Sequence, residues 1–206
     1  MVSIAAVPAA AGVISTVTVL NRLRVVALDD LAATPRAIQA GHVWLLATSA
    51  FVADRPAVPS IVGFLVVGLA ALAVAGGRVL WASAIVGHVF ATVVVYALLD
   101  AASYSVGRAD YGTSAVIAAW IGVVAYHVHR RGRGAAALAL CVVAALVGWL
   151  FRPDLDILDT EHAVALVFGA ATAATLPRVT LPRPQRLVPP LQAWLLLRVR
   201  SARRGG

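Results

Sequence analysis

The chain has 206 residues, of which 61% are hydrophobic and only 13% are charged. A soluble domain carries about 25% charged residues, and one of this size has too little interior to bury so much apolar surface. The composition therefore excludes an ordinary soluble domain. It also excludes a disordered chain, because disorder requires low hydrophobicity. The lipid bilayer is the solvent that remains.

The charge balance is strongly basic. All 17 basic residues are arginine, and with nine acids they give a formal net charge of +8. Because the arginines fall between apolar blocks, they indicate membrane topology and not nucleic-acid binding. The single cysteine, Cys141, excludes an internal disulfide and a cysteine-based metal cluster.

Six apolar segments approach the length of about 20 residues that a membrane-spanning helix needs. They run over residues 2–20, 58–75, 79–99, 112–128, 135–151 and 162–176. They predict an all-α polytopic membrane protein, with a six-helix membrane domain over residues 1–177 and a basic cytoplasmic tail over residues 178–206. The first segment has a cleaved signal peptide as its alternative, although it lacks the early basic residue typical of one.

Two further stretches are apolar without being long enough to span. Residues 41–53, in the long connection after the first segment, predict a re-entrant or interfacial segment. Residues 187–200, which contain a mixture of leucine, Trp194 and arginine, predict a short amphipathic segment on the membrane surface.

The arginines predict an orientation, because basic residues accumulate on the cytoplasmic side. The link 127–133 and the tail are arginine-rich, whereas the link 152–161 carries four acids and one arginine. Both termini are then cytoplasmic in a multi-pass plasma-membrane protein. Four arginines in the connection 21–57 lie outside, against the rule. Asp100, Arg108 and Asp110 are expected to form a charge cluster in an outer loop.

The same topology brings two reactive residues to one depth. Ser114 opens the fourth segment and His162 opens the sixth, and both segments enter the membrane from the outer side. A histidine beside a serine can take the hydroxyl proton and allow the oxygen to attack a carbonyl. The alternatives are a serine that only caps its helix and a histidine that is merely interfacial.

Small residues follow each member of this pair at helical spacing. Ala118 and Gly122 follow Ser114, and Ala165 and Gly169 follow His162. Such residues let membrane helices pack backbone to backbone, although they are common in any helix bundle.

The run Asp110-Tyr-Gly-Thr-Ser-Ala115 resembles the Gly-x-Ser-Gly motif of rhomboid intramembrane serine proteases, with Gly112 and Ser114 at the matching positions and Ala115 in place of the last glycine. His162, followed by small residues at the outer end of the sixth segment, matches the histidine of that family. The resemblance covers about residues 43–176. It implies a rhomboid-like six-helix bundle with a membrane-embedded first outer loop.

The chain also departs from that family. Rhomboid proteases usually carry a histidine and an asparagine at the start of the second helix, where they help to hold the oxyanion, and residues 56–64 contain neither. An aromatic residue that often stacks on the family's catalytic histidine is replaced by Ala118. Besides the Ser114 backbone, we expect Gly112, Thr113 and His88 as oxyanion or supporting residues. His88 has a helix-packing hydrogen bond as its alternative role.

The resemblance implies a serine endopeptidase that cleaves membrane proteins in or near their transmembrane segments, with Ser114 as nucleophile and His162 as base. We expect no metal and no organic cofactor. The partners would be transmembrane segments and the lipid bilayer, and not nucleic acid. One alternative is an inactive rhomboid-like protein that binds transmembrane partners. A second is a small transporter or channel, for which only His88 supplies a polar group at mid-membrane.

Overall fold

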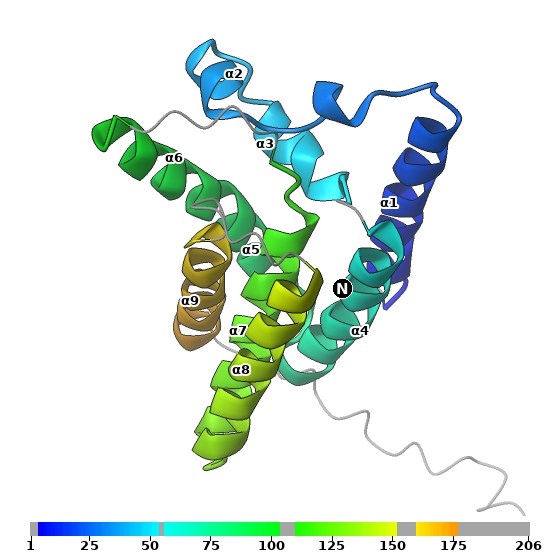
Figure 1. The fold of residues 1–206 in the computed structure, drawn as a ribbon. Coiled ribbons are helices and arrows are strands. Elements are labelled where there is room, and N and C mark those ends of the chain that lie inside the picture. Colours follow the sequence, from blue (N-terminus) through cyan, green and yellow to red (C-terminus); the bar gives the residue numbers. More distant parts are fainter. Residues whose placement is uncertain (1–3, 54–55, 104–109, 152–159, 177–206) are drawn as a thin grey trace, which may run out of the picture.

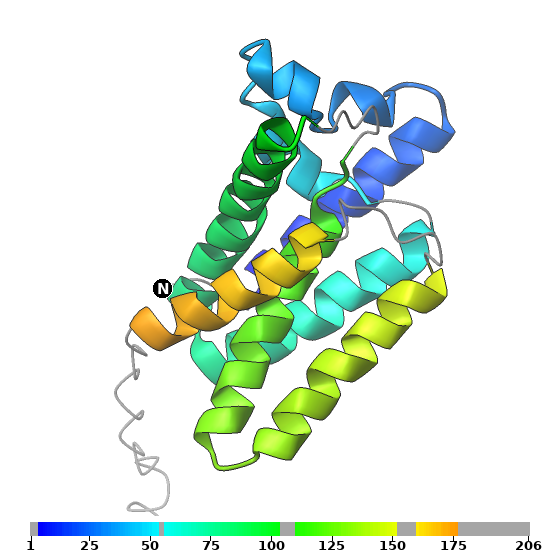
Figure 2. The same cartoon turned by 60° about the vertical axis from the view of Figure 1, so that its left-hand side comes forward.

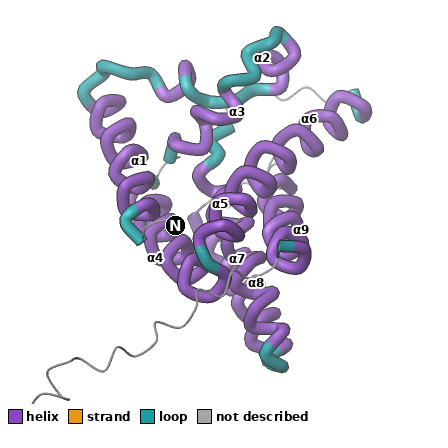
Figure 3. The backbone as a smooth tube through the Cα atoms, turned by 180° about the vertical axis from the view of Figure 1, so that it is seen from behind, coloured by secondary structure: helices purple, strands orange, loops and turns teal. Residues whose placement is uncertain are grey.

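The structure, a computed structural model, describes residues 4–53, 56–103, 110–151 and 160–176. Within these ranges the regular secondary structure is entirely helical, apart from one isolated bridge between Ala33 and Asp110 (Figure 3). The all-α prediction is therefore confirmed. Arg108, most of the acid-rich link and the basic tail lie outside the described residues.

Long helices cover the six predicted segments. They are α1 (Ala6–Arg22), α4 (Ala57–Ala75), a continuous helix formed by α5 (Gly77–Ile85), the π-helix η3 (Val86–Phe90) and α6 (Ala91–Ala101), then α7 (Thr113–Arg130), α8 (Gly134–Phe151) and α9 (Thr160–Thr175). The largest difference at the site is the start of α9 at Thr160, which places Glu161 inside the helix and not in the preceding link.

Two helices in the described part of the chain are long and apolar enough to cross a membrane, judged by length and composition. They are α4 and the continuous helix Gly77–Ala101. The apolar stretch of α8 over Gly134–Leu150 is shorter. The structure thus contains two helices that could cross a membrane, and the crossing of all six segments stays a prediction.

The connection between α1 and α4 folds into short helical turns at one end of the bundle (Figure 1). They are η1 (Leu28–Asp30), α2 (Pro35–Gln39), α3 (Leu45–Thr48) and η2 (Ser49–Phe51). At α2, the Thr34 side chain accepts a hydrogen bond from Ala37 N at 3.1 Å, a typical N-cap. The side chains of Leu45 and Leu46 in α3 are buried, so this segment packs into the bundle.

Helix α7 lies at the centre of the bundle and packs against α9, α4, α8 and α5 (Figure 2). Its Trp120 is completely buried, and its ring lies 4.6 Å from that of Phe64 in α4. A buried indole N–H needs an acceptor, and Trp120 Nε1 donates to Leu80 O at 3.0 Å. This residue therefore fixes α7 to both α4 and α5.

Two glycines allow the chain to reverse between neighbouring helices. Gly76 separates α4 from α5 with a φ of 86°, and Gly132 follows α7 with a φ of 77°. Glycine adopts positive φ without the steric penalty of a side chain. The turns at these two positions consequently let successive helices pack side by side.

Candidate active site at the start of helices α7 and α9

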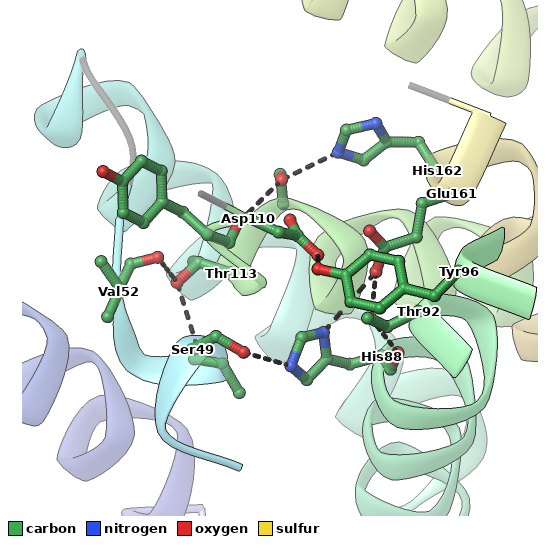
Figure 4. A network of polar contacts seen from close by, with 12 residues as sticks. Ser49, Val52, His88, Thr92, Tyr96, Asp110, Thr113, Glu161 and His162 are labelled. Atoms are coloured by element: carbon green, nitrogen blue, oxygen red, sulfur yellow. Dashed lines mark hydrogen bonds and ion pairs between the residues drawn. The ribbon is translucent and has the colours of Figure 1, made fainter. Parts of the chain in front are cut away.

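Ser114 and His162 are in direct contact. His162 Nε2 lies 2.8 Å from Ser114 Oγ, a hydrogen-bond distance, although the residues are 48 positions apart in sequence (Figure 4). Ser114 is in the first turn of α7 and His162 in the first turn of α9. Both side chains are half-buried, so the pair is accessible from outside the packed core.

Small residues bring the two helices this close. A methyl group added to Gly122 would overlap the carbonyl of Leu166, and one added to Gly169 would overlap the carbonyl of Ala119. Ala165 is completely buried and packs in one cluster with Ala118. The four residues predicted to pack these helices therefore lie at the α7–α9 contact or in its alanine cluster, and the backbones approach without intervening side chains.

The start of α7 is tied to the segment that contains α3 and η2. Gly112 N donates to Ser49 O at 3.0 Å. The hydroxyl of Thr113 lies 2.7 Å from Val52 O and 3.0 Å from Ala50 O. The Thr113 hydroxyl is therefore engaged by these loop carbonyls and does not serve as an oxyanion donor. Its place is that of a supporting residue.

His88 lies behind Gly112, inside the bundle. It belongs to the π-helix η3 and is 1% exposed, and its Nε2 lies 3.1 Å from Ser49 Oγ. Its ring occupies the space beside Gly112, where any Cβ would overlap it. The buried hydrogen bond between His88 and Ser49 agrees with the packing alternative, and a supporting role of His88 in the chemistry stays a prediction. Gly112 supports the site by leaving room for this ring.

Sequence reasoning missed Glu161, which was assigned to the acid-rich link. Its side chain is almost completely buried, with Oε1 2.6 Å from Thr92 Oγ1 and 3.8 Å from His88 Nδ1. The available signal was its place directly before His162, at the start of an apolar segment. Ser49 was missed as well, because a serine within an apolar stretch carries no signal of a distant histidine partner.

Asp100 and Asp110 contact different segments. Asp100 Oδ1 accepts a hydrogen bond from Gln39 Nε2 at 3.1 Å, and Asp110 Oδ2 accepts one from Tyr96 OH at 3.4 Å. Asp110 also exchanges backbone hydrogen bonds with Ala33. Asp100 thus attaches α2 to α6, whereas the Asp110 side chain contacts both Tyr96 in α6 and Glu161 at the start of α9.

The backbone at Ser114 offers a donor for developing negative charge. The first N–H groups of an α-helix have no acceptor within the helix, and the positive end of the helix dipole lies there. Ser114 is the second residue of α7, so its own N–H belongs to this set. The described residues hold no group of three or more His, Cys, Asp or Glu side chains arranged to bind a metal ion.

A pocket of about 410 Å³ lies elsewhere, between the ends of α1 and α4. Asn21, Arg22, Ala53 and Ala57 are among the residues that line it, and neither Ser114 nor His162 does so. The chemistry of the candidate site therefore depends on the half-buried Ser114–His162 contact and not on this pocket.

Comparison of the chain with family models, with curated proteins and with solved structures gives no match. The functional interpretation consequently depends on the geometry described above and on the motif around Ser114.

Proposed function

We propose that this protein is a rhomboid-like intramembrane serine protease that cleaves other membrane proteins in or near their transmembrane segments. The observation that carries the proposal is the 2.8 Å contact between His162 Nε2 and Ser114 Oγ. A serine hydroxyl is a weak nucleophile unless an adjacent base activates it. The half-burial of both residues supports the proposal, since a substrate must reach the hydroxyl.

The proposed reaction has two halves. His162 takes the hydroxyl proton as Ser114 Oγ attacks the scissile carbonyl carbon, and the protonated imidazole then gives that proton to the leaving amine. Water next attacks the acyl ester as His162 takes one of its protons, and His162 gives that proton to Ser114 Oγ when the carbon–oxygen bond breaks and the carboxylic acid leaves. The Ser114 N–H would donate to the oxyanion in both halves.

In this proposal the chain crosses the plasma membrane six times, with both termini in the cytoplasm. The starts of α7 and α9 then face the outer side, from which water reaches the Ser114–His162 pair. The apolar lengths of α4 and Gly77–Ala101 support two of these crossings, and the arginine distribution supports the orientation.

A fluorophosphonate probe tests the proposed nucleophile directly. We expect the purified protein in detergent to be labelled at Ser114, identified by peptide mass spectrometry, and Ser114→Ala and His162→Ala to abolish labelling. Ser60→Ala is the matched control, because Ser60 Oγ contacts only the carbonyl of Pro56 in its own helix, at 3.4 Å. Labelling that persists in Ser114→Ala would exclude the proposal.

One observation favours a second candidate, an inactive rhomboid-like protein that binds transmembrane partners. The first turns of α4, from Ala57 onward, contain neither histidine nor asparagine, and loss of an oxyanion donor can cost about 10²–10³ in rate. A wild-type protein that folds, remains unlabelled and captures single-span membrane proteins would support this candidate over the protease.

A further inference from the structure

Four buried polar side chains lie beside the Ser114–His162 pair and have no part in the proposed chemistry. They are Ser49, His88, Thr92 and Glu161, here named the buried polar cluster (Figure 4). Each is at most 2% exposed. Burying polar groups costs free energy unless they are paired, so a cluster of four in so apolar a chain requires an explanation.

One side of the cluster holds the start of α7. Ser49 contributes twice, because its carbonyl accepts from Gly112 N at 3.0 Å and its hydroxyl lies 3.1 Å from His88 Nε2. The His88 ring in turn packs against Gly112 itself. Gly112 lies two residues before Ser114, so these contacts determine where the first turn of α7 begins.

The other side holds the start of α9. Thr92 Oγ1, in α6, lies 2.6 Å from Glu161 Oε1 and 2.7 Å from His88 O. Glu161 directly precedes His162, so its attachment to Thr92 determines where the first turn of α9 lies. His88 and Thr92 are one turn apart in the same continuous helix, which joins the two sides of the cluster.

We infer that the buried polar cluster is a positioning device, in which Glu161 bound to Thr92 and His88 bound to Ser49 set the separation of Ser114 Oγ and His162 Nε2. This inference rests on the proposed roles of Ser114 and His162. Ser49, His88 and Glu161 repeat the residue types of a serine–histidine–acid triad. Their near-complete burial excludes contact with a substrate, so they are positioning residues and not catalytic ones.

Thr92 provides the sharpest test. Thr92→Val removes the hydroxyl at constant shape, and Thr92→Ser restores it. Thr172→Val is the matched control, because the buried Thr172 hydroxyl bonds only Phe168 O of its own helix, at 2.8 Å. We expect Thr92→Val to slow fluorophosphonate labelling of Ser114 about 10- to 100-fold, as a misplacement of ~1 Å does. Thr92→Ser and Thr172→Val should retain the wild-type rate within about threefold.

A second readout does not depend on activity. In protein with ¹⁵N-labelled histidine, Ser114→Ala should shift the ring signals of His162, because it removes their hydrogen-bond partner. We expect this Ser114-dependent shift in the Thr92→Ser and Thr172→Val backgrounds and its loss in Thr92→Val. If the wild-type protein shows this pattern of histidine shifts but does not react with the fluorophosphonate probe, the proposed protease is refuted and the positioning role is retained.

Two outcomes would overturn the inference. One is a Thr92→Val protein that keeps both the labelling rate and the Ser114-dependent shift. The other is an equal loss in Thr92→Val and Thr172→Val, which would indicate general destabilisation. If Thr92→Val does not fold, Thr92→Cys replaces it. Because its thiol is a weak donor, Thr92→Cys should be labelled at Ser114 more slowly than the wild type and Thr92→Ser are, and a wild-type rate would contradict the inference.

Discussion

Glu161 and His162 are consecutive residues whose side chains bind different helices. Glu161 Oε1 lies 2.6 Å from Thr92 Oγ1 in α6, whereas His162 Nε2 lies 2.8 Å from Ser114 Oγ in α7. Neighbouring positions on an α-helix are rotated by about 100°. The first turn of α9 can therefore contact both helices at once, and its position depends on both.

Replacing Gly112 with alanine should disturb the site by displacing His88. The added methyl group would overlap a ring that is 1% exposed and hydrogen-bonded to Ser49. We expect a loss of about 1–3 kcal/mol in the free energy of unfolding, as for other overpacked positions, together with slower probe labelling. Unfolding in detergent measures the first effect. Gly12→Ala in α1 is the control, because the added methyl group has no atom within 4 Å, and this variant should keep wild-type stability. An equal loss of stability in Gly12→Ala would contradict displacement of His88 as the cause.

Gly169→Ala tests the approach of α7 and α9. The new methyl group would overlap the backbone of Ala119, which cannot rotate away as a flexible side chain could. We expect the helices to separate, with a loss of stability of about 1–3 kcal/mol and reduced labelling of Ser114. Gly148→Ala in α8 meets nothing within 4 Å and serves as the control. Wild-type stability of Gly169→Ala would show that this contact is looser than described.

Ser49→Ala should destabilise the protein although the change is small. It removes the partner of His88 Nε2 and leaves that nitrogen buried. An unsatisfied buried polar group costs about 1–3 kcal/mol. Comparison of unfolding midpoints with Ser60→Ala, whose hydroxyl is exposed, isolates this effect. Equal midpoints for the two variants would argue against the Ser49–His88 hydrogen bond.

The proposed orientation predicts which cysteines a membrane-impermeant maleimide can reach in intact cells. In a Cys141→Ser background, we expect Ala102→Cys, at the exposed end of α6, to be labelled from outside. Arg131→Cys, exposed at the end of α7, should be labelled only after the cells are permeabilised. If Arg131→Cys were labelled in intact cells and Ala102→Cys only after permeabilisation, the orientation would be the opposite one, with the Ser114–His162 pair on the cytoplasmic side.

The helices could be predicted from the sequence because long apolar runs dictate them locally. The pairing of Ser114 with His162 could also be predicted, because two helices that enter the membrane from one side place their first turns at similar depth. Small residues at helical spacing then indicated that the helices approach closely, and Gly122 and Gly169 do lie at backbone contacts.

Two members of the buried polar cluster, Ser49 and Glu161, could not be predicted, because each is paired with a residue far along the chain. Glu161 pairs with a threonine 69 residues away, and Ser49 with a histidine 39 residues away. Only the packing of α9 against α6, and of the η2 turn against η3, creates these contacts. The early start of α9 also made the position of Glu161 unpredictable, since it placed Glu161 in the helix and not in the expected loop.

The π-helical turn at Val86–Phe90 has a consequence for how this chain tolerates insertions and deletions. A π-turn holds one residue more than the α-helical turn it replaces. Because the extra residue is taken up within the turn, deleting a single residue there would restore regular winding and leave α5 and α6 in nearly the same relative rotation. Deleting a residue from a regular turn of α5 would instead rotate everything beyond it by about 100°. The side of α6 that carries Thr92, Tyr96 and Leu99 would then turn away from α9 and from the outer connection. This helix should therefore tolerate the loss of one residue better at the π-turn than in its regular turns.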